Sequence, residues 1–259
     1  MDPHGPVRLL TDNPRSRALS SSSTVTPEPA QVRSMFARIA RVYDPLNRTL
    51  SLGIDQRWRR TLLAAAGEVR GARVVDTCCG TGDVALAFAG AGAHVVGVDF
   101  TPEMLVQADG KKSPDSFAGG PAFAHGDALK LPVRDGVADV CTVAFGIRNV
   151  ADRRLALREM ARVVKPGGRV LVLEFTMPPG PVLGPAYRFY FTRLLPGIGR
   201  VVSKDNDAYS YLPRTVLAWP SPVEFQREME TEGLVECGHR LLTRGIACLH
   251  WGRVPRGTT

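Results

Sequence analysis

Short apolar runs alternate with helical patterns of hydrophobic residues through the middle of the chain. We predict five buried strands, at Arg73–Asp76, His94–Asp99, Ala122–His125, Asp139–Phe145 and Arg169–Phe175. Between them the spacing of apolar residues predicts helices over Asp83–Ala91, from Pro102 onward and over Asp152–Val164. Strands and helices that alternate with short connections are typical of a parallel sheet wound by right-handed crossovers.

The segment before the first strand has a different pattern. Six apolar residues recur at steps of three and four, which indicates a helix with a single apolar stripe. They are Val32, Met35, Phe36, Ile39, Ala40 and Tyr43. The pattern breaks over Asn47–Gly53 and resumes over Trp58–Ala66, so we expect an N-terminal helical cap over residues 31–66.

The last part of the chain predicts the other edge of the sheet. Ser221, Pro222 and Glu224 form a capping-box pattern that begins a helix. The apolar runs Val235–Leu242 and Gly245–Val254 follow, separated by a short turn, and predict an antiparallel pair. The predicted fold class is therefore α/β, with a doubly wound, mostly parallel seven-stranded sheet, an antiparallel edge pair and the helical cap.

Two segments lack a continuous helical or strand pattern. Residues 1–30 are rich in Ser, Pro and Arg, and we expect a disordered tail there. Residues 176–220 are rich in Pro, Gly and aromatic residues and form an insertion within the main domain, residues 67–259. The apolar stretch 183–202 carries three arginines, which favours either a lid that contacts anionic lipid or a buried cap helix.

Composition and charge narrow the class of protein. The 259 residues are 44% hydrophobic and 22% charged, as in an ordinary globular chain. The net charge of +8 is uneven, because residues 1–60 hold ten Lys or Arg against five Asp or Glu, residues 61–180 hold thirteen of each, and residues 181–259 hold ten against seven. A neutral middle with few aromatics argues against a nucleic-acid partner. No apolar run is long enough to span a membrane, so we expect a cytoplasmic protein.

The five cysteines add no site of their own. They lie at positions 78, 79, 141, 237 and 248, without the spacing of metal ligands and without a nearby histidine to complete a set. We therefore expect reduced thiols of an intracellular protein and no bound metal.

A glycine turn after the first strand is the first candidate site. Gly80, Thr81 and Gly82 lie between strand and helix, a pattern shared by dinucleotide sites and S-adenosylmethionine (SAM) sites. Asp76 and Asp83 flank the turn and would repel a pyrophosphate at the helix N-terminus. SAM carries a sulfonium and an ammonium instead of phosphate, so the pattern favours SAM over NAD.

Acidic residues also follow the second and third predicted strands. Asp99 lies 23 residues after Asp76, where its carboxylate can accept hydrogen bonds from both ribose hydroxyls, and Phe100 beside it can pack on adenine. Asp127 precedes Ala128 just after the third strand, at a position suited to the adenine amino group. A solvated loop or a helix cap explains any one of these acids, but a set that follows successive strands favours a nucleoside site.

Four motifs in chain order resemble the menaquinone/ubiquinone biosynthesis C-methyltransferase family, within the class I SAM-dependent methyltransferases. They are Tyr43-Asp-Pro-Leu-Asn47 with Trp58-Arg59, Phe145-Gly-Ile-Arg-Asn-Val150, Arg162-Val-Val-Lys-Pro-Gly-Gly168 with Leu173-Glu-Phe175, and the aromatic series Tyr187 to Trp219-Pro220. The resemblance covers Phe36 to Pro255. It departs from the family at Asp55, where many members have His, which leaves the role of that position in doubt.

The resemblance implies transfer of the SAM methyl group to a ring carbon of a reduced, prenylated quinol, most like demethylmenaquinol. It implies that Arg148 stabilises the developing phenolate, that Asn149 hydrogen-bonds a quinol oxygen and that Tyr43 contacts the SAM site or the quinol. The alternative for Arg148 is an ion pair with Asp152, and for Tyr43 a place at the end of the apolar stripe. Transient membrane contact and a homodimer stay open.

Three other functions remain as hypotheses. The first is SAM-dependent methylation of another substrate, either a different small aromatic or polyketide or the benzoquinol of ubiquinone synthesis. The second is a SAM-binding protein without catalysis, against which the intact Arg148-Asn149 pair argues. The third is an NAD-dependent oxidoreductase, which Asp83 disfavours.

Overall fold

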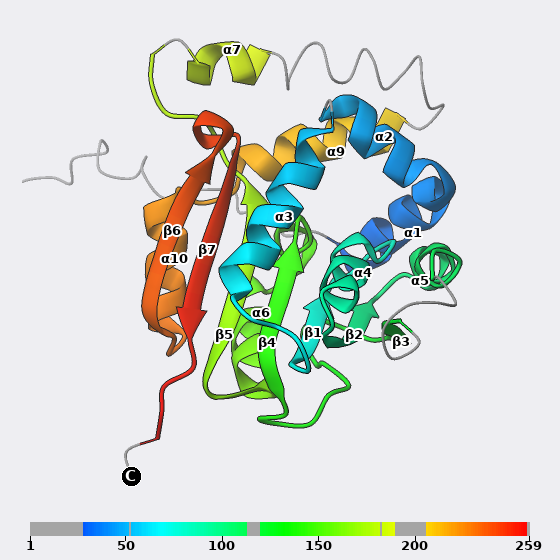
Figure 1. Cartoon of the computed structure of the whole chain (residues 1–259). Coiled ribbons are helices and arrows are strands. Elements are labelled where there is room, and N and C mark those ends of the chain that lie inside the picture. The colour runs from blue at the N-terminus through cyan, green and yellow to red at the C-terminus, as the bar shows by residue number, and fades with distance from the viewer. Residues whose placement is uncertain (1–27, 52, 113–119, 182, 190–205, 258–259) are drawn as a thin grey trace, which may run out of the picture.

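A single seven-stranded sheet organises the computed structural model, which describes residues 28–51, 53–112, 120–181, 183–189 and 206–257. The strand order is β3-β2-β1-β4-β5-β7-β6, with β7 antiparallel to both of its neighbours and the other pairs parallel (Figure 1). The predicted fold class is confirmed, including the antiparallel edge pair. The strands are β1 (Arg73–Thr77), β2 (His94–Asp99), β3 (Ala122–His125), β4 (Ala138–Ala144), β5 (Val164–Phe175), β6 (Val235–Leu242) and β7 (Ala247–Arg253).

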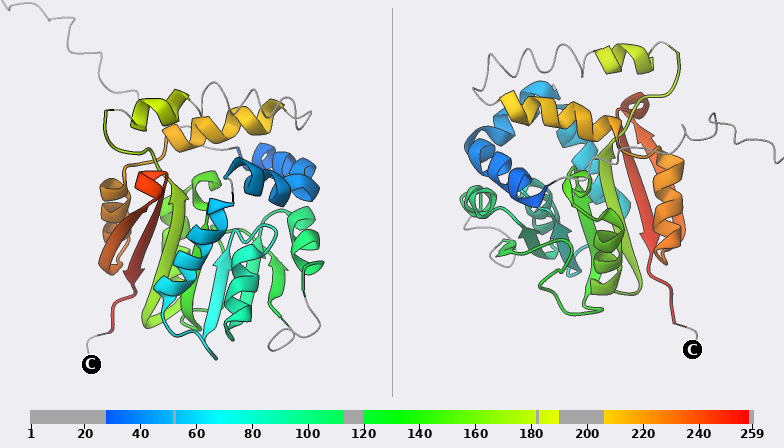
Figure 2. Two further views of the ribbon diagram at one scale, coloured as in Figure 1. Left: turned by 45° about the horizontal axis from the view of Figure 1, so that its top comes forward. Right: turned by 180° about the vertical axis from the view of Figure 1, so that it is seen from behind.

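Helices cover both faces of the sheet because successive strand residues point to opposite sides. Val75 and Val170 pack with α6 (Arg153–Val163) and α10 (Pro222–Thr231) in one core. Their neighbours Val74 and Leu171 pack with α3 (Ile54–Ala66) and α4 (Asp83–Gly90) in the other. Figure 2 shows α6 and α10 together on the face seen from behind. The sequences of the strands are therefore nearly continuous apolar runs, as expected for a sheet buried on both faces.

The remaining helices gather at the carboxyl end of the parallel strands. Of the predicted cap, α1 (Pro29–Ile39), the short helix η1 (Ala40–Val42) and α2 (Tyr43–Leu50) lie at this end, and we call these three helices the cap, whereas α3 packs on the sheet. Helix α1 contacts α5 (Pro102–Asp109). On the same side, α7 (Leu183–Phe189) and α9 (Asn206–Leu217) lie above the ends of the strands (Figure 2). No described helix is both long enough and apolar enough to cross a membrane.

The structure moves two predicted boundaries. Helix α2 continues to Leu50, so the break narrows to a turn in which Gly53 adopts φ +74° before α3 begins. Strand β5 begins at Val164 instead of Arg169, because its first residues pair irregularly with β4 across a bulge between Ala138 and Val140. The Pro and Gly residues that predicted a turn are part of that irregular stretch.

One local prediction is confirmed in detail. Ser221 and Glu224 form the expected capping box of α10, with the Ser221 side chain accepting from the Glu224 N–H and the Glu224 side chain accepting in return. Asp55 is buried in the first turn of α3, where it accepts a 2.7 Å hydrogen bond from Ser51 Oγ and lies 3.6 Å from Arg59 Nε. Its role is therefore structural, as an anchor for the start of α3.

Some predictions concern residues outside the described part of the chain. The tail expected over residues 1–30 falls almost wholly on residues 1–27, and much of the stretch 183–202 falls on 190–205. Of the insertion 176–220 the structure therefore describes the beginning, α7 and α9.

Candidate functional site

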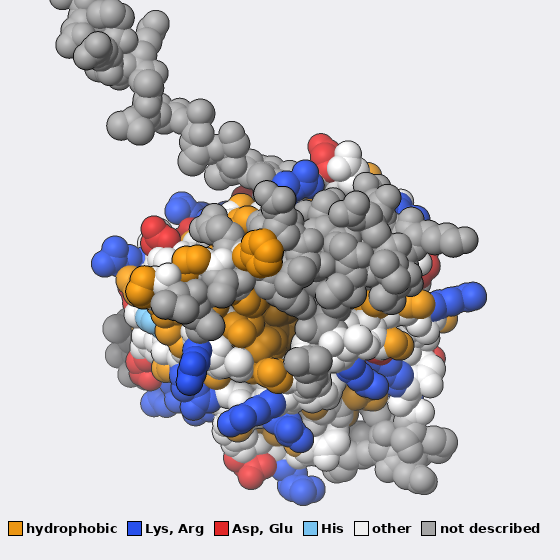
Figure 3. All heavy atoms as spheres, turned by 90° about the horizontal axis from the view of Figure 1, so that it is seen from above, with side chains coloured by type: hydrophobic (Ala, Val, Ile, Leu, Met, Phe, Trp, Pro, Cys, Tyr) orange, Lys and Arg blue, Asp and Glu red, His pale blue; other side chains and the backbone are white. Residues whose placement is uncertain are grey.

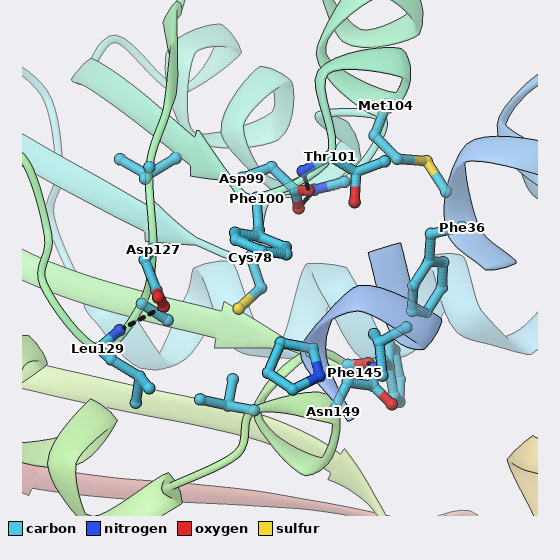
Figure 4. Close-up of a pocket in the computed structure, with 18 of the residues that line it drawn as sticks. Phe36, Cys78, Asp99, Phe100, Thr101, Met104, Asp127, Leu129, Phe145 and Asn149 are labelled. Carbon is cyan, nitrogen blue, oxygen red and sulfur yellow. Dashed lines mark hydrogen bonds between the residues drawn. The ribbon is translucent and has the colours of Figure 1, made fainter. Parts of the chain in front are cut away.

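A cavity lies where the carboxyl ends of β1, β2 and β4 meet the N-terminal cap (Figure 4). The strand order changes direction between β1 and β4, and ligands of open α/β sheets bind at such switch points. The cap closes one side of the cavity with the apolar stripe predicted for it. Residues from the cap that line the cavity are Pro29, Val32, Phe36 and Tyr43.

Of the three residues of the glycine turn, Gly80 lines the cavity, and Thr81 and Gly82 do not. Gly80 lines the cavity with φ +54°, and a Cβ added there would meet no protein atom within 4 Å, so this backbone faces open space. Gly82 instead fills a packing role, because a Cβ there would lie 2.7 Å from Phe123 and 2.9 Å from Ala108. Thr81 is buried and donates a 2.6 Å hydrogen bond to Asp44 Oδ1 of the cap.

Asp99 hydrogen-bonds to the glycine turn, and its carboxylate oxygens can still accept further hydrogen bonds from a ligand in the cavity. Its Oδ2 accepts from the Gly80 N–H at 2.8 Å and its Oδ1 from the Thr101 N–H at 2.8 Å. Each carboxylate oxygen has a second lone-pair site, which a hydroxyl of a ligand can use. Burial raises the pKa of Asp99, and the two backbone N–H groups oppose that rise.

Phe100 and Asp127 line the adjoining wall, as the sequence predicted for a nucleoside site (Figure 4). The Phe100 ring stacks with His125 at a centroid distance of 6.3 Å, and the His125 Nε2 lies 3.1 Å from the Phe100 carbonyl oxygen. Asp127 Oδ1 accepts from the Leu129 N–H at 2.9 Å, which orders the loop, and Ala128 beside it also lines the cavity. These residues form one continuous surface.

Asp76 lies beneath the glycine turn and does not line the cavity itself. It is buried, and its Oδ2 has no hydrogen-bond partner among the described residues. Burial raises the pKa of Asp76 to about 8, although the positive charge of Arg59 lowers it. The carboxyl group is therefore mainly neutral at pH 7 without a ligand, where the sequence argument assumed a free negative charge.

Asp83 also differs from the charge that the sequence suggested. Its carboxylate pairs with Lys111 at 2.7 Å and lies 4.0 Å from Arg59. Burial acts to raise the pKa of Asp83, but the hydrogen bond from Lys111 and the charge of Arg59 lower it on balance. Asp83 is thus ionised and paired, so its repulsion of a phosphate is weaker than the sequence alone implied.

Two features of the cavity were not anticipated from the sequence. Cys78 and Phe145 both line it and both have positive φ, 51° and 59°, at the ends of β1 and β4. The backbones meet there so closely that a Cβ at Gly146 would lie 2.5 Å from Cys78 Cβ. Such conformations are costly for residues with side chains and are concentrated at functional sites.

The cap is tied to this site by charged groups that sequence reasoning missed. Asp44 pairs with Lys111, which also pairs with Asp83 at the start of α4. Together with the bond from Thr81 to Asp44, these contacts join the cap, α4 and the segment after α5. We call Asp44, Thr81, Asp83 and Lys111 the cap latch. Tyr43, next to Asp44, lines the cavity.

Arg148 and Asn149 belong to the short helix η3 (Ile147–Asn149) after β4. The Arg148 side chain is only 7% exposed and pairs at 2.7 Å with Glu174 of β5, which is fully buried. The guanidinium also donates to the Phe145 carbonyl oxygen. The alternative partner, Asp152, instead caps α6 by accepting from two backbone N–H groups. Asn149 lines the cavity, whereas Arg148 lies just behind its wall.

The sequence of the chain matches a known protein family and several curated proteins. The sequence profile described as the ubiE/COQ5 methyltransferase family matches residues 24–254. The chain belongs to that family. Among curated proteins, it is 45% identical over 223 residues to a demethylmenaquinone methyltransferase of Thermus thermophilus, covering 85% of this chain and 100% of that protein. It is 44% identical over 225 residues to the ubiquinone/menaquinone biosynthesis C-methyltransferase UbiE of a Geobacter species, covering 86% and 95%.

Solved structures agree on the fold. A Haloferax volcanii putative methyltransferase complex with the activator Trm112 matches with a TM-score of 0.64 and 17% identity, over 85% of this chain and 98% of that one. Phosphoethanolamine N-methyltransferase 2 of Haemonchus contortus, solved with S-adenosyl-L-methionine, matches with a TM-score of 0.57 and 14% identity, over 77% of this chain and 53% of that one. At these identities the matches concern the fold alone, which is that of the methyltransferases.

No metal centre is formed by the described residues, since no three His, Cys, Asp or Glu side chains gather there in a way that could hold an ion. The described cysteines are free thiols, and burial raises the pKa of Cys78 and Cys79 well above the usual value.

Proposed function

We propose that this protein transfers the methyl group of SAM to a ring carbon of reduced demethylmenaquinol. The observation that carries the proposal is the cavity, in which Gly80, Asp99 and Asp127 face the same space at the switch point of the sheet. The names of the curated relatives support the quinol as acceptor. The cap and α9 lie over this end of the sheet, on the side where a lipophilic acceptor would enter (Figure 2).

The cavity fits a nucleoside with a cationic tail. The open space at Gly80 leaves room for the ligand, and Asp99 has free acceptor sites for ribose hydroxyls. Phe100 and the Asp127 loop offer a ring face and an acceptor for adenine. Asp76, with its unpartnered Oδ2 below the turn, would ionise when a positive charge binds nearby.

The residues of η3 support methyl transfer to carbon. SAM supplies an electrophilic methyl group, and its sulfur keeps the bonding electrons when the methyl leaves. Loss of the phenolic proton places negative charge on the oxygen and makes the ring carbon nucleophilic, and the guanidinium of Arg148 would stabilise this phenolate. The charge moves from the oxygen toward the methyl group as the carbon–carbon bond forms, and the ring C–H proton then leaves to water, which restores the aromatic ring. Asn149 and Tyr43 would orient the ring and exclude water from the cavity.

A direct assay tests this function. Purified protein is incubated with SAM and short-chain demethylmenaquinol under reducing conditions, in parallel with the corresponding demethylbenzoquinol, and the products are resolved by mass. We expect a carbon-methylated naphthoquinol and S-adenosylhomocysteine in equal amounts. Asn149→Ala is the control, with SAM binding retained and turnover reduced roughly 10-fold or more, as for one lost transition-state hydrogen bond. Product from the benzoquinol alone would reassign the substrate, and product from neither would reject the proposal.

A further inference from the structure

Three buried polar atoms lie without partners around Arg148. They are Arg148 Nε, Asn149 Oδ1 and the Tyr211 hydroxyl, and none has a hydrogen-bond partner within the described residues. Arg148 and Asn149 come from η3, and Tyr211 comes from α9, which contacts η3. Buried polar groups are almost always paired, so unpaired ones on two elements that contact each other favour a missing ligand.

The contacts of the Arg148 guanidinium show how its position is fixed while its Nε stays unpaired among the described residues. The Nη1 of Arg148 is already used by Glu174 and the Phe145 carbonyl oxygen, and the guanidinium lies 5.3 Å from the centre of the Phe175 ring. The group is fixed from two sides, and its Nε has no acceptor in the part of the chain that the structure describes. Asn149 lines the cavity and separates it from the other two atoms, so a ligand in the cavity would lie next to this group.

The donor and acceptor types of these three atoms limit which ligand group they can bind. Arg148 Nε–H is a donor, Asn149 Oδ1 is an acceptor, and a tyrosine hydroxyl is both. A single phenolic hydroxyl matches them, since it can donate to the amide oxygen and accept from the guanidinium and the tyrosine. A carboxylate would meet an unfavourable contact at Asn149 Oδ1, and an ammonium would meet one at Arg148.

We propose that the hydroxyl of Tyr211 donates a hydrogen bond to a phenolic oxygen of the quinol, which makes α9 one wall of the acceptor site. The inference rests on the proposed function and adds a substrate-binding residue to it. Burial raises the pKa of Tyr211, so the hydroxyl stays protonated and acts as a donor at neutral pH. When the phenolic proton leaves and the ring carbon becomes nucleophilic, this bond and the charge of Arg148 stabilise the same phenolate oxygen.

Tyr211→Phe tests the proposal because it removes only the hydroxyl. That hydroxyl has no described partner, so the melting temperature should stay the same or rise. SAM affinity should also stay the same. The KM for demethylmenaquinol should rise roughly 3- to 10-fold, the effect of one lost hydrogen bond. The matched control is Thr215→Val, one turn later on α9, where the hydroxyl donates to the Tyr211 carbonyl oxygen. It should leave KM unchanged.

Substrate analogues separate binding from packing. Two naphthol analogues, each lacking one of the two quinol hydroxyls, are compared with wild type and Tyr211→Phe. For the analogue that lacks the hydroxyl bound by Tyr211, the two proteins should have equal kcat/KM, whereas the other analogue should preserve the difference. Such a cycle isolates one contact.

Each outcome decides the inference. A Tyr211→Phe protein with wild-type KM and kcat would overturn it, as would a fall in activity that simply follows a fall in melting temperature. An equal loss with both analogues would indicate that Tyr211 holds only an ordered water, and would also overturn it. If the proposed function itself is wrong, the wild-type protein will methylate no quinol. That result would reject both proposals and is distinct from a change seen only in Tyr211→Phe.

Discussion

At the scale of single residues, Asp76 shows what burial does to a carboxyl group below a ligand site. Burial raises its pKa to about 8, far above the ordinary value of 3.8 for an aspartate side chain. The folded protein without ligand therefore binds this proton more tightly than the unfolded chain does. The contribution to stability is complete below about pH 4 and is lost as the pH rises toward 8.

Asp76→Asn should remove this pH dependence. The stability of the variant relative to wild type should increase between pH 4 and 8, by up to about 1.4 kcal/mol per pH unit. Urea unfolding at several pH values without SAM measures the difference. The variant should also bind SAM roughly 10-fold more weakly, since it cannot supply the negative charge that would form beneath the bound cation. Asp109→Asn, at an exposed residue, is the control. Parallel stability curves for Asp76→Asn and wild type would contradict the assigned protonation.

The sequence predicted these site residues by type and position, but not their states. Spacing after the strands placed Asp99, Phe100 and Asp127 on one surface, because carboxyl ends of parallel strands share an edge. It gave no sign that Arg148 pairs with Glu174, which lies 26 residues later and meets it only through the β4–β5 pairing. The charge of Asp76 was likewise hidden, since burial is a property of the packed protein.

At the scale of secondary structure elements, the cap latch determines how the cap is held against the core. The contacts of Lys111 with Asp44 and Asp83 connect elements that are distant in the sequence. Alternating strands and helices were predictable because hydrophobic periodicity is local. The latch was not, because Lys111 and Asp44 are ordinary polar residues until the fold brings them together.

Lys111→Met should loosen the cap while keeping the length of the side chain. Asp44 and Asp83 would then lose the ammonium that pairs with both of them, although Arg59 would still lie near Asp83, so the cap should open more often. We expect roughly 3- to 10-fold weaker SAM binding, for a partly buried ion pair worth about 1 kcal/mol. Calorimetric titration measures the affinity, and trypsin cleavage at Arg41 and Arg48 should become faster.

Lys112→Met is the matched control for this change. Lys112 is the next residue, and it pairs with Asp109, whose side chain is 67% exposed. Its loss should alter SAM affinity by less than about twofold, since exposed ion pairs contribute little. Wild-type affinity in Lys111→Met would show that the latch does not hold the cap over the cavity.

At the scale of the whole molecule, the end above the sheet carries both apolar and basic side chains. Figure 3 shows a hollow lined by hydrophobic side chains at this end, with Lys and Arg side chains around it. Val42 is 45% exposed and Phe189 is 59% exposed, and Arg41 and Arg48 are exposed on the cap. The excess of positive charge in the first 60 residues, noted in the sequence, thus lies partly on this end.

We expect this end to contact anionic lipid when the quinol is taken up. Sedimentation with phosphatidylglycerol-containing vesicles should detect binding that weakens with salt. Arg41→Glu combined with Val42→Ser should reduce it roughly 10-fold, because each basic residue near such a surface contributes about 1 kcal/mol. Arg134→Glu, also at an exposed residue but in the loop that leads into the amino end of β4, should have little effect. Equal binding by both variants would contradict a defined membrane face.

The pairing of Arg148 with Glu174 has a consequence for local stability. Glu174 lies in β5, between the parallel part of the sheet and the antiparallel edge, and it has no exposed surface. Opening this strand means unfolding the sheet, whereas the cap is held mainly by side-chain contacts that can separate alone. The side of the cavity that contains Arg148 and Glu174 is therefore rigid, and the side formed by the cap can open. A small ligand could then exchange through local openings of the cap while the Arg148–Glu174 pair stays intact.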